Sequence, residues 1–220
     1  MFWLPYVLAA ATGAAPALPQ GSYRYSAALA GVSAGTSTLT VKGDGTTTQI
    51  DETASGSANG MQFSGTDELV LGTDLAPTQY QGTYSVAGQQ SKVNVALTPT
   101  TATVSNSVSA APQTFALDPA AKHFVVIEPG LLSGMFALPA QMQAWNDSTV
   151  SAIAPGYGRV EALPPSPSAS AQRPASVPAS DVALAVGGSV PFVVWYDPAT
   201  LVPDEIDVPS QSATVTRVRD

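Results

Sequence analysis

The chain has 220 residues with 16 acidic side chains, 8 basic side chains, one histidine and no cysteine, so its formal net charge is -8. Eight scattered basic residues cannot form the positive surface that phosphate backbones require, which excludes nucleic acid as a partner. Disulfides, thiol chemistry and cysteine-ligated metal sites are excluded as well. Charged residues make up only 11% of the chain, and 18 Gly and 19 Pro punctuate it. This composition favours strands and turns over helices.

The N-terminus resembles a secretory signal. Residues 2–11, FWLPYVLAAA, are an apolar run of the length of a signal-peptide core, and Ala15-Pro16-Ala17 matches the small-residue cleavage pattern. No Lys or Arg precedes the run, which departs from the usual signal. No later stretch approaches the roughly 18 apolar residues that a membrane-spanning helix needs. We therefore expect a signal peptide at 1–17, cleavage after Ala17 and a periplasmic or extracellular protein.

Short runs that alternate apolar and polar residues fill the first half of the remaining chain. Tyr23 and Tyr25 share one face of the first run, and Leu39 and Val41 share one face of the second. Turn signals such as Asn59-Gly60 separate the runs. Since consecutive antiparallel strands usually pair directly, a meander is expected. Its predicted strands are 22–30, 31–41, 46–57, 60–71, 79–86, 90–98, 101–108 and 113–117.

Only one convincing helix is predicted, after a short strand at 124–127. Apolar residues recur at helical spacing from Leu131 to Trp145, and Pro129 suits the first helical position. A strand is expected over 149–154, and four closing strands are expected over 181–186, 189–196, 205–208 and 213–219. Residues 163–180, rich in Pro and Ser, predict a flexible loop. Because the part after this loop is too short to fold alone, we expect one domain over 18–220.

About a dozen antiparallel strands and one helix predict a mainly β fold. Wide sheets twist and curl, so we expect a strongly curved antiparallel sheet, a half-barrel or near-closed barrel, with the helix against its concave face. One helix covers less than the whole concave surface, so a cavity for a hydrophobic ligand is one outcome and a filled core is the other. The residues predicted to bind such a ligand are Leu131, Met135, Leu138, Met142, Trp145, Tyr23, Tyr25, Tyr84 and Trp195.

Three segments resemble a group of uncharacterised secreted bacterial β proteins. YRYSAALAGVSAGTSTLTV resembles their first hairpin, with Gly31, Gly35, Leu39 and Val41 at the places of its G-x-x-x-G-x-x-x-L-x-V pattern. HFVVIEPGLLSGMFALPAQMQAWNDSTVSAIAPG resembles their strand, helix and strand unit, and VPFVVWYDPATLVPDEIDVP resembles their closing hairpin. That group is similar in architecture to periplasmic lipoprotein-localisation factors, in which a curved sheet and a helix hold acyl chains. The resemblance implies a carrier role in the cell envelope and brings no catalytic residues.

Candidate catalytic residues are weak. Ser133 lies in G-x-x-S-G, which differs from the G-x-S-x-G nucleophile elbow, so a role in helix packing is expected. His123, the single histidine, is expected at a surface or strand end. Asp204, Glu205 and Asp207 lack the spacing of a calcium loop and are expected to be solvated turn charges. The sequence therefore predicts no catalytic residue, metal site or cofactor.

Two functions from different classes remain open. The first is a non-enzymatic carrier of a hydrophobic small molecule or lipid. The second is a structural or interaction module of the cell envelope with a solid core and a protein partner. A hydrolase is a third, weaker reading, because it would need His123 or a pair of carboxylates to converge in a cleft.

Overall fold

The computed structural model describes residues 17–58, 60–107, 111–128, 130–147, 149–167 and 172–219. The predicted signal peptide, apart from Ala17, lies outside the described residues. No helix in these ranges has the length and apolar character needed to cross a membrane.

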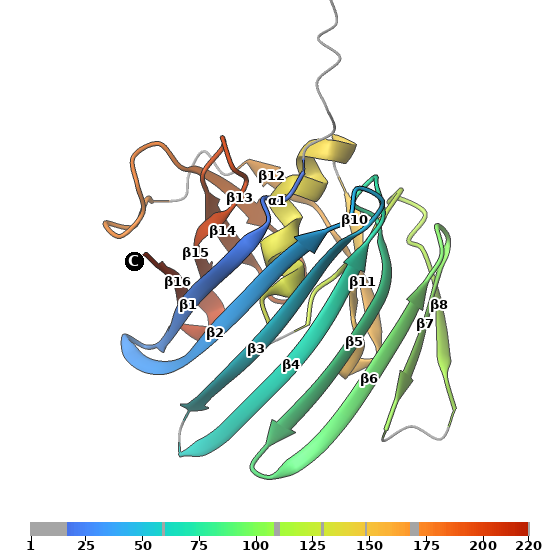
Figure 1. Cartoon of the computed structure of the whole chain (residues 1–220), viewed down its shortest axis with the longest axis horizontal. Coiled ribbons are helices and arrows are strands. Elements are labelled where there is room, and N and C mark those ends of the chain that lie inside the picture. Colours follow the sequence, from blue (N-terminus) through green and yellow to red (C-terminus); the bar gives the residue numbers. More distant parts are fainter. Residues whose placement is uncertain are drawn as a thin grey trace, which may run out of the picture.

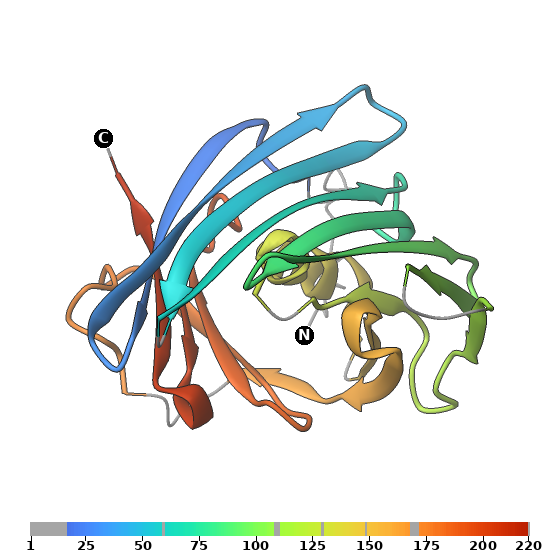
Figure 2. The same cartoon turned by 90° about the horizontal axis from the view of Figure 1, so that it is seen from below.

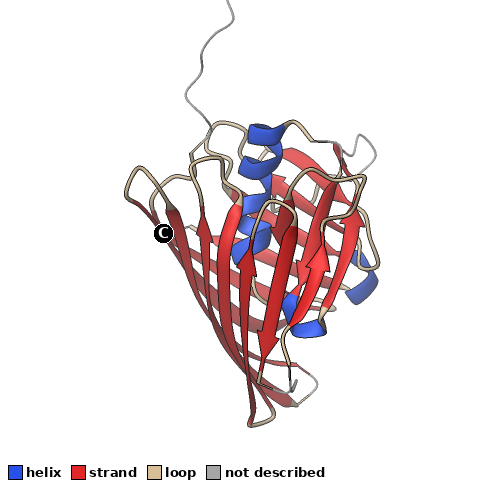
Figure 3. Ribbon diagram, turned by 90° about the vertical axis from the view of Figure 1, so that its right-hand side faces the viewer, coloured by secondary structure: helices blue, strands red, loops and turns tan. Residues whose placement is uncertain are grey.

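Thirteen strands form one curved sheet whose paired neighbours are antiparallel (Figures 1 and 3). Strands β1 to β8 follow one another across the sheet, as do β12 to β16, and β16 pairs with β1 to join the two sets. Among the described strands the two end strands, β8 and β12, do not pair with each other, so the sheet is an open half-barrel. The strands are β1 (Gly21–Leu29), β2 (Val32–Gly43), β3 (Thr48–Ala58), β4 (Met61–Leu71), β5 (Pro77–Val86), β6 (Gln89–Leu97), β7 (Thr101–Asn106), β8 (Gln113–Ala116), β12 (Pro165–Pro167), β13 (Val182–Val186), β14 (Phe192–Tyr196), β15 (Pro203–Val208) and β16 (Ala213–Val218).

The chain between β8 and β12 covers the concave face of this sheet. It holds helix α1 (Ser133–Trp145) and a small sheet of β9 (Phe124–Val126), β10 (Val150–Ala154) and β11 (Arg159–Leu163). Figure 2 shows the large sheet arching over α1. The helix contacts β3 and β4 on one side and β9 and β14 on others. The predicted mainly β fold, with one α-helix against the concave face of a strongly curved sheet, is therefore confirmed.

Alternation along the strands explains why one face of the sheet is apolar. Inward positions of neighbouring strands carry Tyr25, Leu39, Ile50, Leu69 and Tyr80, all buried, while polar residues between them are mostly exposed. The helix is apolar nearly all round because it lies between the large and small sheets.

One glycine lets the helix lie close to the small sheet. A Cβ on Gly134 would lie only 1.6 Å from the Val126 carbonyl oxygen of β9, so a larger residue there would push α1 away.

The C-terminal third differs from the sequence-based expectation in several places. Strands β11 and β12 were not predicted, and β12 lies within the Pro/Ser-rich segment. Its prolines are tolerated because it is an edge strand, which among the described strands pairs only with β13. The remainder of the predicted loop is described only over 172–180, where the Arg173 guanidinium lies 5.1 Å from the Trp195 ring centroid and donates a hydrogen bond to the Asp181 carbonyl. In the middle of the chain, the predicted helix begins two residues later than expected, at Ser133.

The expectation that the acidic residues at the β14–β15 turn are solvated was wrong for two of them. Asp204 and Glu205 are buried. Asp204 pairs with Arg217 and Arg219, and Glu205 accepts hydrogen bonds from the hydroxyls of Ser176 and Thr216. The turn itself is shorter than assumed, because β15 already begins at Pro203 and places both residues within the sheet.

Candidate functional site

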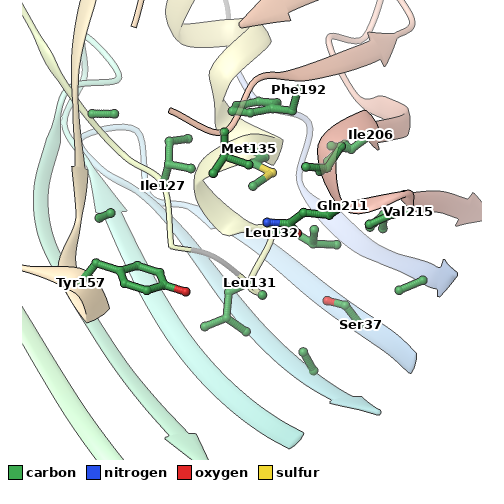
Figure 4. Close-up of a pocket in the computed structure, with 18 of the residues that line it drawn as sticks. Ser37, Ile127, Leu131, Leu132, Met135, Tyr157, Phe192, Ile206, Gln211 and Val215 are labelled. Atoms are coloured by element: carbon green, nitrogen blue, oxygen red, sulfur yellow. The ribbon is translucent and has the colours of Figure 1, made fainter. Parts of the chain in front are cut away.

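A cavity of about 430 Å³ lies between the large sheet, the small sheet and the N-terminal end of α1 (Figure 4). Its volume falls within the range of about 300–1,000 Å³ that is usual for small-molecule sites. The lining residues that Figure 4 labels are Ser37, Ile127, Leu131, Leu132, Met135, Tyr157, Phe192, Ile206, Gln211 and Val215.

Small side chains leave the space open. Five alanines line the cavity, from strands on opposite walls: Ala27, Ala54, Ala152, Ala154 and Ala213. Larger apolar side chains such as Ile127, Met135 and Phe192 bound the end nearest the helix. A wall of methyl groups leaves room that Leu or Phe at the same positions would fill, and it offers an apolar ligand an apolar surface.

The cavity is open at the end of the sheet that carries the β1–β2, β3–β4 and β5–β6 turns. Tyr157, in the 3-10 helix η1 (Pro155–Tyr157), lines this end and is 68% exposed. Gln211, in the 3-10 helix η2 (Pro209–Gln211), is also exposed and lies on the other side in Figure 4. We refer to this opening between Tyr157 and Gln211 as the mouth. The N-terminus of α1 forms the opposite, inner end.

A carboxylate from the large sheet caps the helix at that inner end. Helix α1 has no capping side chain of its own. Instead Glu52 of β3 accepts hydrogen bonds through Oε2 from the backbone N–H groups of Leu132 and Ser133, at 2.6 and 2.8 Å. Its other oxygen accepts a hydrogen bond of 2.6 Å from the hydroxyl of Ser37, which lines the cavity. The helix is therefore fixed to the sheet at the point where it forms the cavity's inner wall.

Two further buried carboxylates lie near the same helix end. Asp67 of β4 accepts a 2.6 Å hydrogen bond from the Ser133 hydroxyl through Oδ2, and its Oδ1 is buried as well. Glu128 accepts a 2.7 Å hydrogen bond from the backbone N–H of Gly156. We call Glu52, Asp67 and Glu128 the acidic cluster. Its position suits the positive end of the helix dipole.

Burial dominates the electrostatics of the acidic cluster. Burial, and secondly the charge of Asp67, raises the pKa of Glu52 well above the usual range of a carboxyl. Burial also raises the pKa of Asp67, against hydrogen bonds from Ser133 and Tyr80 that lower it. For Glu128, burial raises the pKa to about 7, partly offset by the hydrogen bond from Gly156. The folded protein therefore holds protons on this cluster at pH values where an unfolded chain would release them.

The structure places two of the nine predicted ligand-binding residues on the cavity wall, namely Leu131 and Met135. Leu138 is buried in the core, and the half-buried Met142 and Trp145 pack against that core farther along the helix. Trp145 also donates a 2.7 Å hydrogen bond to the Asp74 carbonyl.

The predicted aromatic residues are also placed away from the cavity. Tyr23 packs on Phe136 with ring centroids 5.0 Å apart, and Tyr25 donates a hydrogen bond to the Pro203 carbonyl. The hydroxyl of Tyr84 is hydrogen-bonded to that of Tyr80 at 2.7 Å. Trp195 lies on the opposite face of β14 from the inward Phe192 and Val194, because side chains alternate along a strand. These four residues stabilise the fold around the cavity.

The candidate catalytic residues do not meet in a cleft. The ring of His123 stacks on Trp145 at 4.3 Å, and its Nδ1 lies 2.6 Å from Asp147 Oδ2. This group is at the C-terminal end of α1, whereas Ser133, buried and bonded to Asp67, is at the N-terminal end. In the described ranges no group of three or more His, Asp or Glu side chains has a geometry that could hold a metal ion.

Sequence reasoning missed the acidic cluster, although strand parity carried a signal for two of its members. Glu52 stands between the inward residues Ile50 and Ala54, and Asp67 precedes the inward residue Leu69 by two positions. A carboxylate at an inward position of an alternating strand needs a buried donor, which here is the helix N-terminus. Glu128 gave no such signal, because it lies outside a strand.

In comparisons with known proteins, no family model, no curated protein and no solved structure matches the chain. The function proposed below therefore rests on the cavity and its surroundings.

Proposed function

We propose that this protein holds an apolar or amphiphilic, lipid-like molecule in the cavity at the N-terminal end of α1. The single observation that carries the proposal is a cavity of about 430 Å³ whose walls are largely Ala, Leu, Ile, Val, Met and Phe side chains and which opens at one end of the sheet. This arrangement suits a ligand with an apolar body and one polar end. The apolar body would lie against the alanine walls, with the polar end at the mouth.

Binding would be driven by the removal of apolar surface from water. Each methylene group that enters the cavity contributes about 0.8 kcal/mol. About ten methylenes would contribute about 8 kcal/mol, the free energy of a micromolar complex, before the cost of immobilising the ligand is subtracted. An acyl chain of medium length thus reaches useful affinity without any charged contact in the cavity.

The proposed role is binding and carriage rather than catalysis, and the proposed place of action is the periplasm or the cell exterior. The chemistry of the cavity wall supports a role in binding. Two of its polar side chains are engaged within the fold: Ser37 donates its hydroxyl to Glu52, and the Glu161 carboxylate accepts hydrogen bonds from the backbone N–H and the hydroxyl of Ser189. The signal-like sequence at 1–17 supports a place of action in the periplasm or outside the cell. A structural module of the envelope would need no open cavity.

Displacement of a fluorescent fatty acid tests the proposal. Met135 and Met142 are both half-buried methionines of α1, but only Met135 lines the cavity. We expect wild-type protein to bind the probe, Met135→Gln to bind it at least about tenfold more weakly, and the matched control Met142→Gln to bind it as wild type does. Absence of probe binding, or equal weakening by both substitutions, would contradict the proposal and favour the structural module.

A further inference from the structure

Exposed apolar side chains gather at the cavity end of the molecule. Among the described residues the large exposed apolar side chains number six. Val32, Met61 and Val86 are 69%, 54% and 51% exposed and stand beside the β1–β2, β3–β4 and β5–β6 turns, and the fourth, Tyr157, stands at the mouth. We call these four residues the tip residues. The other two, Val182 and Val218, stand at the other end of the sheet, at the start of β13 and at the end of β16.

The same end of the sheet is almost free of charge. Its described turn residues are 30–31, 60, 87–88, 107, 111–112, 187–191 and 209–212, and none of them is Asp, Glu, Lys or Arg. The turns at the other end carry Asp44, Asp74 and Asp197, and the ion pairs of Asp204 and Asp147 lie there too. Charged side chains do lie close to these turns: Lys92 of β6, Glu161 of β11, which accepts hydrogen bonds from Ser189, and Asp207 of β15, which accepts hydrogen bonds from Trp195 and Thr214. A chain with a net charge of -8 thus keeps its acidic turns at one end.

Strand length separates the two ends. The 11 residues of β3 span about 35 Å. This is several times the Debye length of about 8 Å at physiological ionic strength, so the acidic turns have little electrostatic effect at the tips.

We propose that the tip residues dock the mouth of the cavity onto the surface of a phospholipid bilayer. This inference rests on the proposed function, because a lipid-like ligand that enters from a bilayer avoids water only if the mouth meets that bilayer. The side chains at the tips fit an interfacial position. Tyr157 has an apolar ring with a polar hydroxyl, as is common at membrane interfaces, and the Ser, Gly and Gln residues of the turns carry no charge.

The spacing of the tip residues favours a bilayer over a protein partner. Of the three aliphatic ones only Met61 and Val86 lie on neighbouring strands, and Val32 stands two strands away from Met61, so the three form a broken row rather than the single contiguous patch that a stable protein interface presents. A fluid bilayer accepts separated side chains one by one. Each contributes by the apolar area it buries.

Partition of the full chain into phosphatidylcholine vesicles, measured by flotation, tests this docking. The tip variant carries Val32→Asp, Met61→Asp and Val86→Asp, and the matched control carries Val182→Asp and Val218→Asp at the other end. All five positions are exposed, so the fold is retained, and circular dichroism checks it. The apolar run at residues 2–11 is common to all chains and cancels in the ratio of their partition coefficients.

We expect the tip variant to partition at least about 100-fold less than the control, which should match wild type. We also expect the partition of the wild-type chain to be insensitive to salt, because no charged turn meets the surface. Equal partition of the tip variant and the control would overturn the docking surface, as would a steep loss of binding on adding salt.

The fatty-acid assay in solution separates this inference from the proposed function, since Val32, Met61 and Val86 do not line the cavity. A tip variant that still binds the probe but partitions like the control refutes only the docking. A wild-type chain that docks but binds no probe refutes the carrier function, and with it the reason proposed for docking. If the tip substitutions abolish capture of an envelope protein while vesicle partition stays unchanged, the surface is a protein interface and the bilayer proposal is wrong.

Discussion

Raising the pH from 5 to 8 should destabilise this protein, because the acidic cluster is easier to protonate when folded than when unfolded. Below about pH 4.5 both states hold the proton, and the stabilisation is fully present. As the pH rises, the unfolded chain releases protons first, so the free energy of unfolding falls until the pH passes the folded-state pKa. The pKa of Glu128 is raised by burial from 4.5 to about 7. This residue alone therefore contributes a loss of about 2.5 kcal/mol between pH 5 and pH 8.

Glu52 and Asp67 act in the same direction, because burial raises the pKa of each. Denaturation with guanidinium chloride at pH 5 and pH 8 measures the loss as a drop in unfolding free energy. Glu128→Gln should remove about 2.5 kcal/mol of it, because Gln keeps an acceptor for Gly156 but does not titrate.

The matched control for this experiment is Asp44→Asn. Hydrogen bonds from Thr47 and Thr46 in the β2–β3 turn lower the pKa of Asp44, so it titrates well below pH 5. Its substitution should leave the difference between pH 5 and pH 8 unchanged. A wild-type protein that is equally stable or more stable at pH 8 would refute the reasoning, as would a Glu128→Gln variant with the full wild-type pH dependence.

Three other outcomes follow from the cavity and the helix cap. In a series of fatty acids, each added methylene should tighten binding about fourfold until the cavity is full, after which affinity should level off; titration calorimetry showing no dependence on chain length would argue against an apolar cavity. Ala54→Phe and Ala152→Phe should each lower ligand affinity at least about tenfold without lowering the melting temperature, because the ring enters empty space. A melting temperature lowered by several degrees in scanning calorimetry would show that the space is already filled. Glu52→Ala should cost about 1–3 kcal/mol of stability, because it leaves the buried N–H groups of Leu132 and Ser133 without an acceptor. Glu52→Gln should recover part of this loss. A cost of Glu52→Ala below about 0.5 kcal/mol in chemical denaturation would contradict the capping role.

The hairpins of the large sheet were predictable because their signals are local. Alternation placed Leu39 and Val41 on the inward face, and turn residues such as Gly60 marked the ends of strands. The pairing of β1 with β16 was not predictable. It joins residues such as Arg24 and Val218 that lie almost the whole chain apart, and no local pattern selects that partner.

The sequence left open whether the concave face holds a cavity or a filled core, and it did not place the cavity. The sequence indicated that the helix lines it, yet apolar residues surround α1 because two sheets enclose it. Periodicity therefore could not tell Met135, which faces the cavity, from Met142, which packs elsewhere. The alanines that leave the space open carried no signal, since small residues are equally at home in a filled core.

Native mass spectrometry of the protein isolated from its producing cell tests the carrier function most directly. The proposed function predicts one lipid-like molecule of added mass per wild-type chain, removed in the double variant Ala54→Phe, Ala152→Phe. A wild-type chain that shows only the mass of its polypeptide, even after incubation with acyl ligands of increasing length, would contradict the account.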